Sequence, residues 1–428
     1  MKAIIKEILL ENQHTELPHV IKRRLHIPLD AALIISLVGA RRSGKTYLLY
    51  DLMNTLLKNG LERKKILFVN FEDERLALTT AGLDLIVQAY SELYPEIDLN
   101  DVYLFFDEIQ NVKGWEKFVR RLYDTKTRHI FITGSNSRLL STEIASELRG
   151  RTIAYTVYPL SFSEYLDFKG VSKNLYPQRN KSAIIHHAEK FLVQGGFPET
   201  VGLEHPLRVK LLQQYFNVMI FRDIVERYEI SNIEALRFFI KKLFAGVTKT
   251  FSVNKAYNDL RSMGYKISNK YLYDYLTWCN DAFLCQSIGR FSFSEIKQAK
   301  SDKKPYIVDT GLLSAVEFSV SENKGKLLEN MVFLEFLKSE KDLFYFKGLH
   351  ECDFIVKDGR SLFPVQVAWS MNDASTRERE LKGLTEACNH LGIDGGMIVC
   401  FDQEEEIQYE GKSVQVYPFY KYFLETLR

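Results

Sequence analysis

The sequence lacks the features that mark secreted, membrane-spanning and disulfide-rich proteins. It has five cysteines in 428 residues, and no two of them form a CxxC pair, so neither a zinc site nor a disulfide framework is expected. The N-terminus has no hydrophobic segment typical of a signal peptide, and no apolar run has the length of a transmembrane helix. We therefore expect reduced, mostly buried thiols in a cytoplasmic protein without a membrane partner.

An excess of charge of either sign is also missing. The 57 Lys and Arg residues nearly balance the 55 Asp and Glu residues, giving a formal net charge of +2 at pH 7. Composition thus provides no general argument for nucleic-acid binding, and any basic surface would have to be local. The length exceeds what one hydrophobic core supports, so two to four domains are expected.

One strong motif lies near the N-terminus. The apolar run 33–38 precedes Gly39-Ala40-Arg41-Arg42-Ser43-Gly44-Lys45-Thr46, and a helical pattern continues from Tyr47. Buried strand, tight loop and helix form the setting in which GxxxxGK[ST] binds phosphates. The glycines let the backbone N–H groups point inward at the helix N-terminus. Residues 39–47 are therefore the expected ATP-binding segment.

Two side chains of this segment have specific expected roles. Lys45 would reach the β- and γ-phosphates, and the hydroxyl of Thr46 would ligate Mg²⁺. A second apolar run, 102–106, ends in Asp107 and Glu108. Because neighbouring strand residues point to opposite faces, these two carboxylates cannot share one role. Asp107 is expected to hold Mg²⁺, and Glu108 is expected to act as the general base for the attacking water.

Further candidates follow along the chain. The apolar run 129–133 leads into a polar turn, in which Asn136 or Ser135 would contact the γ-phosphate. Arg149 or Arg151 would supply positive charge to that phosphate, in trans from a neighbouring subunit or in cis after closure, although a structural salt bridge is an equal alternative. Residues 1–27 are expected to form a lead-in helix, and its basic cluster at residues 22–24 to be a solvated helix end.

The order of these motifs resembles a group of prokaryotic AAA+-like P-loop ATPases, close to the archaeal-type ATPases and the signal-transduction ATPases with numerous domains. The resemblance covers nearly the whole chain, and it implies ATPase chemistry with ATP and Mg²⁺ as cofactors. It also implies that the Gly195-Gly196-Phe197-Pro198 element of a helical lid packs near the adenine, so Pro198 is a cofactor-binding candidate. The motifs that carry it are residues 39–46, Phe106-Asp107-Glu108, Thr133-Gly134-Ser135-Asn136-Ser137, Leu148-Arg149-Gly150-Arg151, Tyr158-Pro159-Leu160-Ser161-Phe162, Gly195-Gly196-Phe197-Pro198 and residues 304–313.

The expected fold class is α/β, with four parts. Residues 1–158 form a P-loop ATPase core with a parallel sheet, and residues 159–230 form a helical lid. Residues 231–300 show three helical segments followed by a strand pair, which is typical of a winged helix. If its third helix entered the major groove of DNA, the N-terminal half of that helix would carry Asn269, Lys270 and Tyr273. A winged helix that makes only protein contacts is an equal alternative.

Residues 301–428 resemble the restriction-endonuclease-like fold. Such a site needs two carboxylates for Mg²⁺ and a lysine near the scissile phosphate. Glu329, Asp353 and Gln366 occupy matching places, but Gln366 carries no charge. Ala368 leaves the lysine's place empty unless a basic residue reaches in from elsewhere. We expect a degenerate nuclease fold that does not cut DNA.

The sequence therefore predicts an ATPase that hydrolyses Mg-ATP to drive or switch a winged-helix and nuclease-like module. Two alternatives stay open: a low-turnover nucleotide-dependent switch or scaffold with protein partners, and an ATP-dependent DNA nuclease. DNA or a protein could be the partner of the last two domains, and the chain could form a homo-oligomer.

Overall fold

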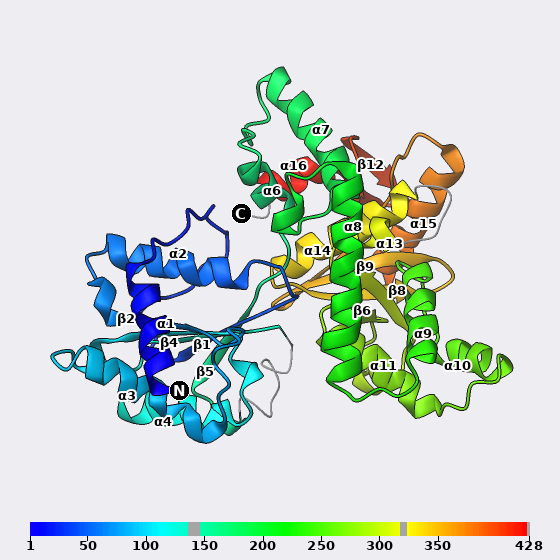
Figure 1. Cartoon of the computed structure of the whole chain (residues 1–428). Helices are drawn as coiled ribbons and strands as arrows, with labels where there is room; N and C mark the ends of the chain where they lie inside the picture. The colour runs from blue at the N-terminus through cyan, green and yellow to red at the C-terminus, as the bar shows by residue number, and fades with distance from the viewer. Residues whose placement is uncertain (136–145, 317–322, 426–428) are drawn as a thin grey trace. The chain divides into compact units, whose positions relative to one another are not determined.

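The computed structural model describes residues 1–135, 146–316 and 323–425 (Figure 1). The chain divides into two compact units, residues 1–158 and 159–428. Within the described residues, no helix is long and apolar enough to cross a bilayer. All five cysteines are buried and unpaired, which confirms the expectation of buried free thiols.

Unit 1 is built on a five-stranded parallel sheet with the strand order β2-β3-β4-β1-β5. The first four strands are apolar along almost their whole length and buried, as expected for a parallel sheet covered on both faces. Since all five strands run the same way, their carboxyl ends meet at one edge. The strands are β1 (Ile34–Val38), β2 (Ile66–Asn70), β3 (Tyr103–Asp107), β4 (Ile130–Gly134) and β5 (Thr152–Thr156).

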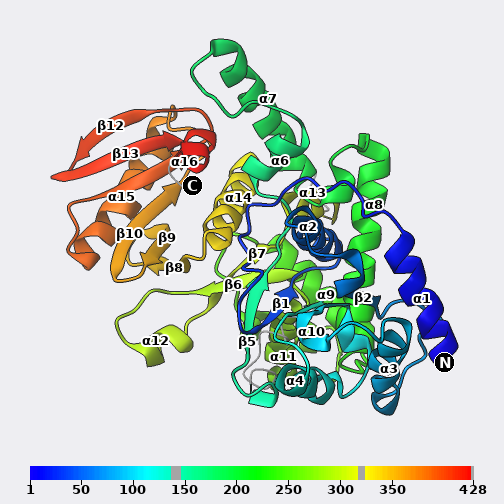
Figure 2. The same ribbon diagram turned by 90° about the vertical axis from the view of Figure 1, so that its left-hand side faces the viewer.

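Helices cover this sheet. The apolar side of α2 buries Leu48, Leu49, Leu52, Met53 and Leu56 in a core shared with the strands. Figure 2 shows α1 beside α3 and β2, with which it is in contact. The helices are α1 (Lys2–His14), α2 (Lys45–Lys58), α3 (Asp84–Leu93) and α4 (Trp115–Thr125), with short 3₁₀ turns η1 (Arg63–Lys65), η2 (Thr80–Gly82), η3 (Leu99–Asp101) and η4 (Ile109–Asn111).

The expected lead-in helix over residues 1–27 is wrong in its second half. Helix α1 ends at His14, and residues 15–33 contain neither helix nor strand. The side chain of Asn54 on α2 donates a hydrogen bond to the carbonyl of Pro18, so this segment lies against α2. Proline disfavours helical backbone in the residue before it, and Pro18 and Pro28 both fall in this stretch.

The first part of unit 2 is helical, as the sequence predicts. Two glycines interrupt it for a packing reason. A Cβ on Gly195 would lie 2.2 Å from Oδ1 of Asp309, and one on Gly196 would lie 2.4 Å from the carbonyl oxygen of Leu160. The elements are α6 (Phe162–Phe168), α7 (Gln178–Gln194), η6 (Pro198–Thr200), α8 (His205–Val218) and the π-helix η7 (Met219–Glu226).

Three further helices and a strand pair follow. Ser252 and Ser268 cap the second and third helices with hydrogen bonds to backbone N–H groups. Strand β6 pairs antiparallel with β7, so the predicted domain boundary at residue 300 runs between two paired strands. The winged-helix assignment itself stays a prediction. These elements are α9 (Ile233–Ala245), α10 (Val253–Ser262), α11 (Asn269–Asp281), β6 (Cys285–Gly289), α12 (Glu295–Ala299) and β7 (Lys303–Ile307).

The last part of unit 2 is a mixed six-stranded sheet with the order β12-β13-β11-β10-β9-β8. Helix α15 contributes Leu381, Leu384, Ala387 and Cys388 to the main core of this sheet. The strands are β8 (Asp342–Lys347), β9 (Glu351–Asp358), β10 (Ser361–Val367), β11 (Gly395–Cys400), β12 (Glu405–Tyr409) and β13 (Lys412–Pro418); the helices are α13 (Thr310–Val316), α14 (Lys324–Lys338), α15 (Ala374–Leu391) and α16 (Phe419–Glu425).

Candidate functional site

The loop between β1 and α2 has the backbone geometry of an anion-binding nest. Gly44 has φ 98° and forms the N-cap of α2, a conformation that favours glycine. Gly39 has no room for a side chain, because a Cβ there would lie 2.1 Å from the carbonyl oxygen of Val157. The loop therefore turns tightly into the helix N-terminus, where backbone N–H groups and the helix dipole favour an anion.

Lys45 is buried inside this loop. Its ammonium donates hydrogen bonds to the carbonyls of Gly39 at 3.2 Å and Ala40 at 3.1 Å. It also lies 3.4 Å from a carboxylate oxygen of Glu108. The structure thus brings the expected phosphate-binding lysine and the expected general base together at the carboxyl edge of the sheet.

Asp107 is a buried carboxylate that accepts a hydrogen bond at each of its oxygens. Thr46 donates a hydrogen bond to its Oδ2 at 2.8 Å, and Thr133 donates one to its Oδ1 at 2.6 Å. Burial is the main cause that raises the pKa of Asp107 to about 6, and the nearby Glu108 adds to this. A hydroxyl and a carboxylate side by side are the hard oxygen donors that Mg²⁺ prefers, so Thr46 and Asp107 fit this ion.

Glu108 has an unusual backbone and a different electrostatic environment. It adopts φ 52° directly after β3, and its N–H donates to the hydroxyl of Thr133 at 2.8 Å. Burial alone would raise its pKa, but the ammonium of Lys45 and the amide of Gln110 together hold that pKa below its ordinary value. Glu108 is therefore ionised near neutral pH, as a general base must be.

Thr133 is a site residue that the sequence analysis missed. Its single hydroxyl contacts both Asp107 and the backbone of Glu108, which links β4 to the end of β3. The available signal was a polar residue at the end of an otherwise apolar strand, beside the candidate sensor residues.

Two buried hydroxyls at this edge point to a ligand. The Oγ atoms of Ser43, in the loop, and Ser135, directly after β4, have no hydrogen-bond partner among the described residues. Buried polar atoms are rarely left unpaired, and the oxygens or water of a bound Mg-nucleotide would satisfy both. Asn136, the other expected sensor, lies outside the described residues.

Arg23 braces the loop from the N-terminal segment. One guanidinium nitrogen donates to the carbonyl of Ser43 at 3.0 Å, and the other donates to the carbonyl of Tyr158 at 2.8 Å. The expectation that residues 22–24 form a merely solvated basic cluster is therefore wrong for Arg23. Nothing in the local sequence indicates this contact, because its two acceptors lie 20 and 135 residues away.

Of the remaining loop residues, Ala40 is buried, Arg41 is partly buried, and Arg42 and Tyr47 are exposed. Arg41 pairs with Glu72 at 3.0 Å, and Arg42 adopts φ 64° with an exposed side chain. Tyr47 is about half exposed and stacks edge-on with Tyr50 of the same helix. These positions fit the rim of a nucleotide site.

The structure does not bring Arg149 and Arg151 to the phosphate loop of their own chain. Arg151 precedes β5, where its carbonyl accepts a hydrogen bond from the first residue of β1. The loop begins at the other end of β1, roughly 15 Å away for five strand residues. Arg151 pairs instead with Asp124 at 3.1 Å, which is the structural alternative that the sequence left open.

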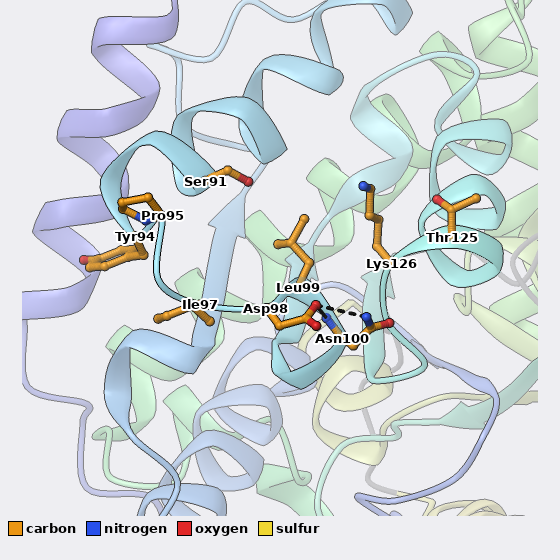
Figure 3. A pocket seen from close by; sticks show the side chains of 9 residues that line it. All are labelled: Ser91, Tyr94, Pro95, Ile97, Asp98, Leu99, Asn100, Thr125 and Lys126. Carbon is orange, nitrogen blue, oxygen red and sulfur yellow. Dashed lines mark hydrogen bonds between the residues drawn. The ribbon is translucent and has the colours of Figure 1, made fainter.

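A pocket of 260 Å³ lies at the end of the sheet away from the phosphate loop (Figure 3). It lies near the start of β3, whereas Asp107 ends that strand, so this pocket is distinct from the nucleotide site. Asp98 caps the turn η3 at its rim. The lining residues are Ser91, Tyr94, Pro95, Ile97, Asp98, Leu99, Asn100, Thr125 and Lys126.

The candidates in unit 2 have their own surroundings. Pro198 is the first residue of η6, and its expected adenine contact stays a prediction. On α11, Lys270 and Tyr273 are exposed, whereas Asn269 donates a hydrogen bond to Asn254 of α10. Two of the three expected base-reading residues therefore face solvent.

The nuclease-like candidates come together, but with an unexpected partner. Glu329 on α14 and Asp353 on β9 both lie 2.8 Å from the ammonium of Lys304, which belongs to β7. Gln366 on β10 accepts a hydrogen bond from the N–H of Asp353 at 2.9 Å. Burial opposes the charge of Lys304, but Asp353 and Glu329 raise its pKa above its usual range. Burial and Asp353 raise the pKa of Glu329 above its ordinary value, and the ammonium of Lys304 opposes this.

The parallel sheet with its phosphate loop after β1 is a P-loop fold of the AAA+ type. A family model described as an AAA domain matches residues 31–166. Two models described as domains of unknown function match residues 185–324 and 324–422. The two models meet at residue 324, so the paired strands β6 and β7 both lie in the segment 185–324.

Two curated relatives match along most of their length. An uncharacterized protein of Methanocaldococcus jannaschii is 35% identical over 441 residues, covering 99% of this chain and 96% of that protein. One of Haemophilus influenzae is 32% identical over 367 residues, covering 86% of this chain and 90% of that protein. The chain belongs to this family, and the AAA domain of its N-terminal part confirms the predicted P-loop ATPase family. The closer placement beside the archaeal-type and signal-transduction ATPases stays a prediction.

The chain is only weakly similar to solved structures. The structure described as the Aeropyrum pernix Orc1 protein in complex with DNA covers 73% of this chain and 90% of that chain, at 10% identity and a TM-score of 0.30. The nuclease-like resemblance of residues 301–428 stays a prediction.

Replacing Lys45 by alanine should weaken ATP binding by about 10- to 100-fold, because hydrogen bonds to a charged group contribute roughly 1.5–3 kcal/mol. Titration calorimetry with ATP and Mg²⁺ measures this. Lys58→Ala, at the exposed end of the same helix, is the matched control. Equal affinity in Lys45→Ala and Lys58→Ala would contradict the phosphate-loop assignment.

Replacing Arg23 by alanine should lower ATP affinity by about tenfold, since the loop loses a charged donor that fixes its backbone. The neighbouring exposed residue gives the control Arg24→Ala. Arg23→Lys should restore part of the affinity, because one ammonium can hold only one of the two carbonyls well. If all three variants bind ATP like the unmodified protein, Arg23 does not position the loop.

Proposed function

We propose that this protein is an ATPase that binds Mg-ATP in the loop of residues 39–47 and hydrolyses it, and that the nucleotide state controls unit 2. The observation that carries the proposal is the arrangement around Asp107. There a buried carboxylate held by Thr46 and Thr133 lies beside a buried Lys45–Glu108 pair. These are the groups needed for a metal ion, a phosphate and an attacking water.

Each group has one role in this proposal. Thr46 and Asp107 hold Mg²⁺, which would neutralise charge on the phosphates when bound. Lys45 binds the β- and γ-phosphates through its ammonium. Glu108 takes the proton of the attacking water, and its low pKa keeps it ionised for this purpose. Asn136 or Ser135 is the proposed contact to the γ-phosphate.

A low-turnover switch is the second candidate, and the position of the arginines favours it. Arg149 and Arg151 lie at the opposite edge of their own sheet, so either one would have to act on the nucleotide of another subunit. An isolated chain would then hydrolyse ATP slowly and hold it for long periods. In this proposal, assembly with a second copy completes the site, and the winged-helix-like and C-terminal parts engage DNA or a protein partner.

Replacing Glu108 by glutamine should leave ATP bound while slowing hydrolysis, since loss of a general base typically costs roughly 10²–10⁴-fold in rate. Single-turnover hydrolysis and filter binding on the same preparation measure the two effects separately. Glu74→Gln, an exposed residue after β2, serves as the control. Hydrolysis by Glu108→Gln at the unmodified rate would remove Glu108 from the mechanism.

The arginine in trans can be tested by mixing two inactive variants. One is Lys45→Ala, which keeps the arginines, and the other is the double variant Arg149→Ala, Arg151→Ala, which keeps the phosphate loop. Turnover should rise when they are mixed, because an arginine supplied in trans contributes roughly 10³–10⁵-fold in other P-loop enzymes.

The control for this mixing experiment is Arg128→Ala, which removes an exposed arginine near the same edge of the sheet. It should be active alone. A specific activity that is independent of protein concentration, together with no gain on mixing, would show that the arginines are structural and would leave the ATP-binding assignment intact.

A further inference from the structure

Lys304 is a charged side chain enclosed by acidic groups in the C-terminal part of unit 2. The side chain is 1% exposed. Its ammonium lies 2.8 Å from Glu329, 2.8 Å from Asp353 and 3.1 Å from Glu351. The three carboxylates come from α14 and β9, whereas the lysine comes from β7, so the cluster is assembled from elements far apart in the sequence.

Protein donors also occupy the outer side of this cluster. The hydroxyl of Tyr306 donates to Glu329 at 2.9 Å, and the N–H of Val367 donates to the second oxygen of Asp353 at 3.0 Å. Gln366 turns its carbonyl oxygen to the N–H of Asp353 and its amide nitrogen to Glu380. Both oxygens of Asp353 are thus engaged by protein donors, and the Glu329 oxygen that contacts Lys304 also accepts from Tyr306.

The geometry around the ammonium is that of a cation site. Three carboxylates from two elements, α14 and β9, converge on one point, and such convergence is costly unless a cation lies there. Carboxylate oxygens are the ligands that Mg²⁺ and Mn²⁺ prefer. In this chain the point of convergence holds an ammonium that is covalently part of the protein and cannot leave.

We propose that Lys304 is the built-in cation of a divalent-cation site formed by Glu329, Glu351 and Asp353, and that it keeps this site closed to Mg²⁺. The lysine expected at position 368 is replaced by one that arrives from β7 and takes the place of the metal. The C-terminal part of unit 2 then binds no catalytic metal and does not cleave nucleic acid, and removal of the Lys304 ammonium uncovers a metal site. This proposal does not depend on the ATPase activity.

The test compares Mn²⁺ binding to the nucleotide-free full chain and to its Lys304→Met variant, by electron paramagnetic resonance of free Mn²⁺. Methionine keeps most of the buried volume and removes only the charge. Lys304→Met should bind one additional Mn²⁺ at least about tenfold more tightly than the unmodified protein. Mn²⁺ should also raise its melting temperature, and Asp353→Asn in the same variant should abolish both effects.

The matched control is Lys303→Met, which changes the preceding and partly exposed lysine of the same strand and should bind Mn²⁺ like the unmodified protein. A folded Lys304→Met variant without additional Mn²⁺ binding would overturn the proposal. Asp353→Asn in the otherwise unmodified chain decides the question even if Lys304→Met does not fold. If Asp353→Asn leaves Mn²⁺ binding unchanged, the native site is closed as proposed. If Asp353→Asn removes Mn²⁺ binding, the native cluster holds metal and the proposal is wrong.

Discussion

The hydrogen bonds of Asp107 to two threonines organise the N-terminal unit. A carboxylate that is almost fully buried is costly, and its two short bonds, to Thr46 of α2 and Thr133 of β4, offset that cost. The same bonds fix the phosphate loop's helix and two neighbouring strand ends relative to each other. Glu108 and Lys45 are positioned by this arrangement, because each directly adjoins one of the bonded residues.

Close packing of the backbone provides the second constraint on the site. Val157 donates to the carbonyl of Val38 at 2.6 Å, and its own carbonyl excludes any side chain from Gly39. Arg23 then connects Ser43 to Tyr158. The segment after β5 thus contacts the phosphate loop directly at Gly39 and, through Arg23, at Ser43. A change in the loop that moves the carbonyl of Ser43 would act on Arg23, and through it on the last residue of this unit.

The two units treat buried carboxylates in different ways. In unit 1 the oxygens of Asp107 accept from hydroxyls, which can turn to accommodate a metal ion, and unsatisfied serine hydroxyls lie nearby. In unit 2 the carboxylates around Lys304 meet an ammonium that belongs to the chain, and Asp353 also accepts a hydrogen bond from the backbone N–H of Val367, so these donors cannot leave. The same residue types therefore face hydroxyls that can rearrange in unit 1 and a fixed ammonium in unit 2.

The sequence by itself determined the features that depend on neighbouring residues. The phosphate loop, the Asp107–Glu108 pair and the three helices of residues 231–300 follow from glycine spacing, apolar runs and caps. The tertiary structure alone decided which distant side chains meet. It brought Arg23 to the loop, Thr133 to Asp107 and Lys304 to Asp353, and it placed Arg151 far from the phosphate loop of its own chain. The physical reason is that strand order and register set these contacts, and neither can be derived from the local periodicity of the chain.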